Sequence, residues 1–247
     1  MKNLFFGSIV AFGVAISMVS CKKNDSQNPS VASTNLDSIA SKYYEQYLKL
    51  HPLEATMQGD NRFNDQLLVN INKDFISEEI AFYKNVNDQL KSIASYSLSA
   101  DQKVVFDVLD YTLKDKIENF AYHPEYIPFT QFSGLPLDFP VMGSGSGTQP
   151  FKTEKDYDNW LKRMEKFPEW MNQAEENFRL GITENVVLPK KLVLKMIPQM
   201  KSDEMTSSNF EKNIFSGPVK NFPKDFSAEQ KEKYSKLFAE SVKKNII

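Results

Sequence analysis

Histidine is the side chain best suited to metal binding and proton transfer near neutral pH, and the chain has only two. His51 directly precedes Pro52, and His123 directly precedes Pro124. Because the residue before a proline disfavours the helical conformation, neither histidine can open the His-Glu-x-x-His helix of zinc peptidases, which places two ligands on one face. We therefore predict that both are loop histidines and that neither contributes to a metal centre.

The other motifs associated with catalysis are incomplete. Residues 143–147 read Gly-Ser-Gly-Ser-Gly, which has the wrong register for a nucleophile elbow and lacks the following Lys-Ser or Lys-Thr of a phosphate loop. We interpret this segment as a closely packed or flexible loop. The acid pairs at 78–79 and 175–176 are adjacent, so their side chains point to different sides of a helix. The sequence therefore predicts no catalytic residue and no metal ligand.

Composition and charge exclude several classes of protein. Apolar residues make up 41% of the chain and aromatic residues 13%, which is enough for a sizeable core. The net charge of −2 argues against a nucleic-acid binder, because phosphate binding requires a basic surface. The one cysteine, Cys21, excludes a disulfide scaffold and a cysteine-based zinc site.

The N-terminal residues have the composition of an export signal. A short positive start is followed by an apolar run over residues 4–19 and then by Ser20-Cys21. The run is shorter than the roughly 20 residues that span a bilayer, and its end resembles the signal of bacterial lipoproteins. We predict a lipoprotein signal over residues 1–20, lipid attachment at Cys21 and a flexible polar tether over 21–33. The alternatives are a plain signal with a chance cysteine and an uncleaved anchor.

Lipid attachment at Cys21 would determine where the protein resides. The chain is then expected to be exported and lipid-anchored to the bacterial cell envelope, at the outer membrane. The membrane would be one of its partners, because several acyl chains together give stable binding to a bilayer.

Residues 34–247 are predicted to form one helical domain. Apolar residues recur at steps of three and four, and no run alternates in the manner of a strand. Pro168 is expected to kink or split the longest helix. This gives an all-α fold of six or seven helices in an irregular bundle. The expected helices cover residues 34–50, 77–93, 99–120, 153–181, 189–200 and 227–242.

Capping residues set the expected ends of these helices. Ser99 and Ser227 are each followed three residues later by Gln, and Thr34 and Thr153 by Asp, as at helix N-termini. Gly181 is expected to end the longest helix.

Residues 122–151 interrupt the helical pattern with closely spaced prolines and glycines. We expect one long ordered loop here, packed on the helices through its apolar side chains, and such loops are often functional. The aromatic residues of the next helix are interpreted as core, with a ligand groove as the alternative. Residues expected to be buried are Trp160, Leu161, Met164 and Phe178. Candidate residues of a cleft or loop site are Phe132, Gly134, Tyr157, Trp160 and Arg163.

Three segments together resemble a known bacterial family. Residues 52–60 read Pro-Leu-Glu-Ala-Thr-Met-Gln-Gly-Asp, residues 128–134 read Pro-Phe-Thr-Gln-Phe-Ser-Gly, and residues 156–163 read Asp-Tyr-Asp-Asn-Trp-Leu-Lys-Arg. Their order and spacing are similar to those of domain of unknown function 885, over roughly residues 36–245. Members of that family carry a His-Glu-x-x-Pro-Gly-His helix in their C-terminal half, similar to the zinc site of helical gluzincin peptidases.

The resemblance implies a zinc-dependent hydrolase that acts on peptides through a metal-activated water. This chain ends at Ile247, before the half that holds the motif, so no zinc ligand is carried over and no cofactor is expected in it. It is expected to be the N-terminal, cleft-shaping portion of a membrane-anchored zinc-metallopeptidase-like lipoprotein, inactive alone. The alternative is a non-catalytic surface lipoprotein that binds a peptide or a protein partner.

Metabolic labelling with an alkyne fatty acid tests the lipid attachment. The wild-type chain is expected to be labelled and the Cys21→Ser variant is not, because Cys21 is the one thiol in the sequence. Equal labelling of the two proteins would show that no lipid is attached at this residue.

Overall fold

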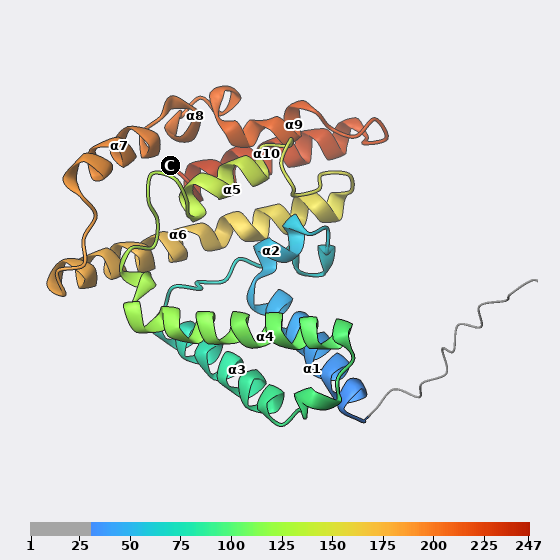
Figure 1. Ribbon diagram of the computed structural model, residues 1–247. Coiled ribbons are helices and arrows are strands. Elements are labelled where there is room, and N and C mark those ends of the chain that lie inside the picture. The colour runs from blue at the N-terminus through green and yellow to red at the C-terminus, as the bar shows by residue number, and fades with distance from the viewer. Residues whose placement is uncertain (1–30) are drawn as a thin grey trace, which may run out of the picture.

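The computed structural model describes residues 31–247, which form helices arranged in two layers (Figure 1). One layer holds α1 (Val31–Leu50), α3 (Lys73–Lys91) and α4 (Ala100–Asn119). The other is built on α5 (Leu135–Gly143), α6 (Glu154–Thr183) and α10 (Ala228–Asn245), with α7 (Lys190–Met200), α8 (Asp203–Thr206) and α9 (Gly217–Lys220) along its outer side. The short helix α2 (Pro52–Met57) lies where the layers meet. The predicted signal and Cys21 fall outside the described residues.

The prediction of an all-α fold is confirmed, since residues 31–247 contain helices and no strand, but the count of six or seven helices is wrong. This part of the chain forms ten α-helices. Six of them, namely α1, α3, α4, α6, α7 and α10, correspond to the predicted segments. The other four, α2, α5, α8 and α9, have six, nine, four and four residues. Helices this short show no clear apolar period and depend on tertiary packing.

Three of the expected helix N-terminal caps are confirmed, and the expected first residues of two helices are wrong. Confirmed N-terminal caps are Ser99, Thr153 and Ser227. The first helix begins at Val31, before the expected cap Thr34. The helix α3 begins earlier than residue 77, because the side chain of Asn72 accepts a hydrogen bond from the backbone N–H of Phe75 and caps it there.

The expected long loop over residues 122–151 contains the helix α5, so its description as a loop is incomplete. Pro136 stands in the first turn of α5, where its missing N–H removes no helical hydrogen bond. Pro140 inside the helix does remove one, and burial of neighbouring apolar side chains offsets that loss. The glycine-rich segment is closely packed: a Cβ atom at Gly143 would lie 1.9 Å from Cζ2 of Trp160.

Pro168 was expected to kink or split the longest helix, and the split does not occur, because α6 continues through Pro168 as one helix. The buried side chains of Phe167 and Trp170 hold the helix to the core on both sides of the proline. Gly181 also does not end the helix, which continues to Thr183. Glycine is required at 181 because a Cβ atom there would lie 2.7 Å from the carbonyl oxygen of Val186.

Each layer has its own hydrophobic core. Between α1, α3 and α4 the buried apolar residues are Leu36, Tyr83, Val86, Leu90, Leu109 and Leu113. The core of the other layer forms around α6, where Trp160 stacks on Phe139 with ring centroids 4.3 Å apart. The predicted burial is confirmed for Trp160 and Met164, both fully buried, whereas Leu161 and Phe178 are partly buried. The helices of residues 31–247 include none with the length and hydropathy of a membrane-spanning segment.

Truncation of Trp160 tests this packing. Trp160→Ala is expected to lower the free energy of unfolding by about 3–5 kcal/mol, as large core truncations do. The matched control is Phe132→Ala, because Phe132 is 81% exposed and its loss should change stability by less than about 0.5 kcal/mol. Urea denaturation followed by circular dichroism measures both. Similar losses in the two variants would contradict the assignment of Trp160 to the core.

Candidate functional site

The guanidinium of Arg163, on α6, is fully buried and is hydrogen-bonded to backbone carbonyls far away in the sequence. Its Nη2 donates to the carbonyl oxygens of Pro52 and Phe63, each at 3.1 Å, and its Nε donates to that of Gln66 at 3.0 Å. These carbonyls belong to α2 and to the segment that follows it. The arginine therefore fixes the path of residues 52–66 against α6.

Three neutral side chains complete the surroundings of this guanidinium, and one of them is Met142, whose Sδ accepts from Nη1 at 3.8 Å. Nη2 lies 2.7 Å from Oγ1 of Thr56, and Nη1 lies 2.5 Å from Oε1 of Gln149. No carboxylate of the described residues hydrogen-bonds or ion-pairs with it. Burial lowers the pKa of Arg163 to about 10, which leaves the group cationic at neutral pH.

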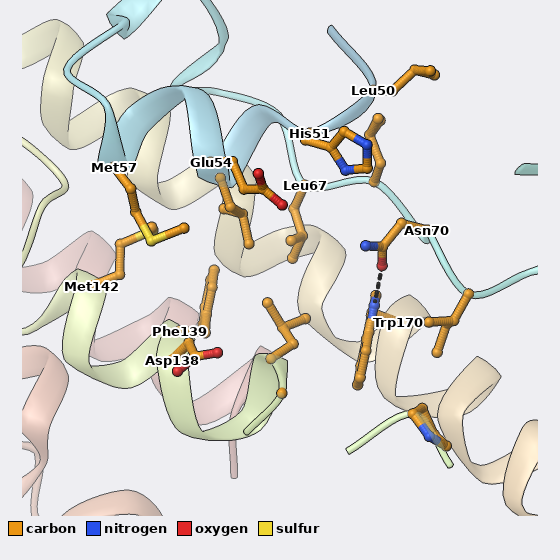
Figure 2. Close-up of a pocket in the computed structure, with 16 residues that line it drawn as sticks. Leu50, His51, Glu54, Met57, Leu67, Asn70, Asp138, Phe139, Met142 and Trp170 are labelled. Carbon is orange, nitrogen blue, oxygen red and sulfur yellow. Dashed lines mark hydrogen bonds between the residues drawn. The ribbon is translucent and has the colours of Figure 1, made fainter. Parts of the chain in front are cut away.

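A pocket of about 270 Å³ lies directly beside this anchor, and we call it the α2–α5 pocket (Figure 2). Its walls come from α2, from the segment 67–71, from α5 and from Trp170 of α6. Most of the lining is apolar, and the apolar residues include Leu53, Leu67, Leu135, Phe139 and Met142.

Two carboxylates stand on opposite sides of this pocket, Glu54 on α2 and Asp138 on α5 (Figure 2). Glu54 Oε2 accepts a hydrogen bond from the hydroxyl of Tyr47. Burial, together with this bond to the carboxylate, raises the pKa of Tyr47, so the hydroxyl remains a donor. Asp138 is exposed, and its carboxylate forms no hydrogen bond or ion pair with the rest of the described chain. Both carboxylates are thus open to a cationic or hydrogen-bond-donating ligand.

His51 and Asn70 contribute the other polar groups of the lining. The side chain of Asn70 is oriented by Trp170, whose Nε1 donates to Oδ1 of Asn70 at 2.9 Å (Figure 2). His51 lies between α1 and α2 and directly precedes the first residue of α2. Its ring packs against that of Tyr47, with ring centroids 4.2 Å apart.

His51 is bound to a buried carboxylate behind the pocket. Its Nε2 lies 3.0 Å from Oε1 of Glu79, which also accepts a hydrogen bond of 2.7 Å from the hydroxyl of Tyr83. Burial opposes ionisation of the Glu79 carboxyl group. The hydrogen bonds from His51 and Tyr83 and the positive charges of His51 and Lys116 favour ionisation and outweigh the effect of burial. The pKa of Glu79 therefore lies below the ordinary value. This cluster ties α3 to the start of α2.

The structure brings only one of the five candidate cleft or loop residues to this pocket. Gly134 lines it, with a φ of 122° that favours glycine. Phe132 is exposed on the surface outside the pocket. Tyr157, Trp160 and Arg163 are fully buried in the core, where Tyr157 donates a hydrogen bond to a backbone carbonyl.

Sequence reasoning missed the polar residues that do line the pocket. Glu54 lies inside the family-like segment 52–60, but nothing in the sequence separates it from a solvent-exposed helix acid. Asp138 and Asn70 stand in segments without a motif. Both histidines lie between helical segments, as predicted, and His123 hydrogen-bonds to the carboxylate of Glu125 at 2.8 Å.

The chemistry available in the pocket is binding of a small ligand. Apolar walls with a few convergent polar groups are typical of ligand sites. Within the described part of the chain, no three His, Cys, Asp or Glu side chains are grouped so that they could hold a metal ion. An apolar ligand group that carries a positive charge would match both the lining and the two carboxylates.

Comparison with family models matches residues 52–247 to the family described as "Bacterial protein of unknown function (DUF885)". Neither the curated proteins nor the solved structures give a match. The matched residues include every group that hydrogen-bonds to the guanidinium of Arg163, and they include both carboxylates of the α2–α5 pocket.

The pH dependence of stability tests the cluster behind the pocket. Because the pKa of Glu79 is lowered on folding, its ionised form stabilises the protein above the ordinary value of 4.5, and this contribution is lost as the pH falls through the folded value. We expect wild type to be more stable than Glu79→Gln at pH 7, with a difference that shrinks steadily below about pH 4.5. Urea midpoints of both proteins between pH 7 and 3 provide the measurement. A difference that stays constant over this range would contradict the lowered pKa.

Proposed function

This chain belongs to the family of bacterial proteins of unknown function DUF885. From that premise we propose that it forms the helical, cleft-shaping portion of a membrane-anchored, zinc-metallopeptidase-like lipoprotein, with the α2–α5 pocket as a subsite for peptides. In this proposal Cys21 carries the lipid that holds the chain at the bacterial outer membrane. The residues of the pocket bind and orient the peptide, and the zinc belongs to the C-terminal half that the family resemblance implies.

The observation that carries the peptide-binding proposal is the pairing of acidic and apolar surface in one small pocket. Asp138 has no cationic partner in the described chain, and Glu54 faces the same apolar walls from the other side. A free peptide N-terminus next to an apolar side chain supplies the complementary pair of groups, an ammonium that donates hydrogen bonds and a hydrocarbon surface. Hydrogen bonds to charged groups contribute about 1.5–3 kcal/mol, which is enough to give selectivity for the charged form.

The residues described here do not fit a zinc site of their own. His51, the histidine of the pocket, has its Nε2 within 3.0 Å of Glu79, and no group of three potential ligands is present in residues 31–247. Zinc enzymes need three protein ligands and an open position for water. We therefore assign binding and no catalytic step to this chain.

Calorimetric titration with a matched pair of peptides tests the proposed subsite. The probes are leucyl-leucine amide, which carries a free ammonium, and its N-acetyl derivative, which is uncharged. The charged peptide is expected to bind about tenfold more tightly, the equivalent of about 1.4 kcal/mol. Asp138→Asn should reduce that preference, because the exposed carboxylate is removed without disturbing the core.

The matched control is Glu176→Gln on the exposed face of α6, which should leave both affinities unchanged. Fluorescence of Trp170, which lines the pocket, provides a second readout of occupancy. Equal affinities for the two peptides, or equal effects of the two substitutions, would contradict recognition of a charged N-terminus by the pocket.

A further inference from the structure

A second hollow lies at the C-terminal end of α6, and we call it the α6–α7 groove. It has a volume of about 500 Å³. One side is formed by Phe178 and Ile182 of α6, and the other by one face of α7. Figure 1 shows α7 at the edge of the molecule, joined to the end of α6 by a short segment. Residues 186–188 of that segment and Ile127 and Phe129 close the remaining walls.

The lining of this groove is apolar and much of it is exposed to water. From α7 the residues Val193, Met196, Ile197 and Met200 line it, at the spacing of one helical face. Ile182 is 66% exposed, Val193 is 39% exposed and Ile197 is 45% exposed. Contiguous exposed apolar surface of this kind is typical of sites that bind a ligand, a protein or a membrane.

Positive charge predominates along α7, which forms one side of the groove. Lys201 is the one charged side chain among the residues that line it. Three further lysines, Lys190, Lys191 and Lys195, stand on α7, and residues 185–202 contain no acid. None of the four lysines forms an ion pair within the described residues, although Asp203 and Glu204 follow shortly after. The charge therefore favours an anionic ligand.

The shape and chemistry of the lining decide between classes of ligand. A peptide in extended conformation would bring backbone N–H and C=O groups, which need hydrogen-bond partners when they are buried. The groove offers a single polar side chain, that of Lys201. A docked helix satisfies its own backbone but has a diameter of about 10–12 Å, whereas the groove has the volume of a small-molecule site, roughly 300–1,000 Å³.

We propose that the α6–α7 groove binds a single-chain anionic amphiphile such as a long-chain carboxylate. The hydrocarbon chain lies between Ile182 and Val193, where it covers their exposed surface. The carboxylate lies at the rim, where Lys201 binds it. This site is separate from the proposed peptide subsite and does not depend on it.

The test is calorimetric titration of dodecanoate, kept below its critical micelle concentration, into the protein. The protein used is the chain from residue 21 onward with the substitution Cys21→Ser, so that no attached acyl chain competes for the groove. Dodecanol is the uncharged comparison. Saturable binding of one dodecanoate per chain is expected, with dodecanol bound more weakly. Lys201→Gln should weaken dodecanoate about five- to tenfold and leave dodecanol unchanged, while Lys195→Gln, on the same helix but outside the lining, changes neither.

Two further variants test the location of the hydrocarbon chain. Val193→Asp should weaken both ligands at least tenfold, and Leu194→Asp should have no effect, because Leu194 is exposed and does not line the groove. Both positions are exposed, so circular dichroism should show an unchanged fold. The proposal is overturned by absence of saturable dodecanoate binding, by equal effects of the two aspartates, or by binding to anionic phospholipid vesicles without binding to free dodecanoate.

Discussion

Burial of one positive charge constrains much of this structure. The guanidinium of Arg163 is removed from water without a direct hydrogen bond or ion pair to a carboxylate of the described residues, although the charge of Asp65 partly offsets its burial. A buried cation is tolerated only when all its N–H groups find acceptors. Most of the acceptors come from positions far away in the sequence, namely Pro52 and Thr56, 111 and 107 residues away, and the loop that follows them, while Gln149 and Met142 accept from Nη1. Formation of the interior around α6 therefore requires that α2 be placed correctly at the same time.

That requirement links the two layers. The three-helix layer of α1, α3 and α4 has its own core, and α2 is one of the elements that join it to α6. Arg163 holds α2 from one side, and the contact between His51 and Glu79 holds its start from the other. Glu54 is one turn away from these contacts, so its position in the α2–α5 pocket follows from them. The family-like segments 52–60 and 156–163 contact each other through the hydrogen bonds of Arg163 to Pro52 and Thr56.

The two hollows of the molecule have different chemistry, and this separates their proposed ligands. The α2–α5 pocket combines apolar walls with carboxylates from two helices, and it suits a cationic group on an apolar body. The α6–α7 groove combines apolar walls with a lysine, and it suits an anionic group on a hydrocarbon chain. Both hollows lie beside α6, which lines the α2–α5 pocket near its middle, at Trp170, and the α6–α7 groove near its C-terminal end, at Phe178 and Ile182.

The sequence by itself determined what depends on residues close together in the chain. The helical class, the six longer helices and the caps at Ser99, Thr153 and Ser227 follow from local period and local hydrogen bonds. Tertiary structure alone decided the rest. Pro168 lies within a continuous helix because flanking side chains are buried, and α5 forms in a proline-rich segment because Phe139 packs on Trp160. The pocket could not be predicted for the same reason: Glu54 and Asp138 are ordinary helix acids until packing places α2 opposite α5.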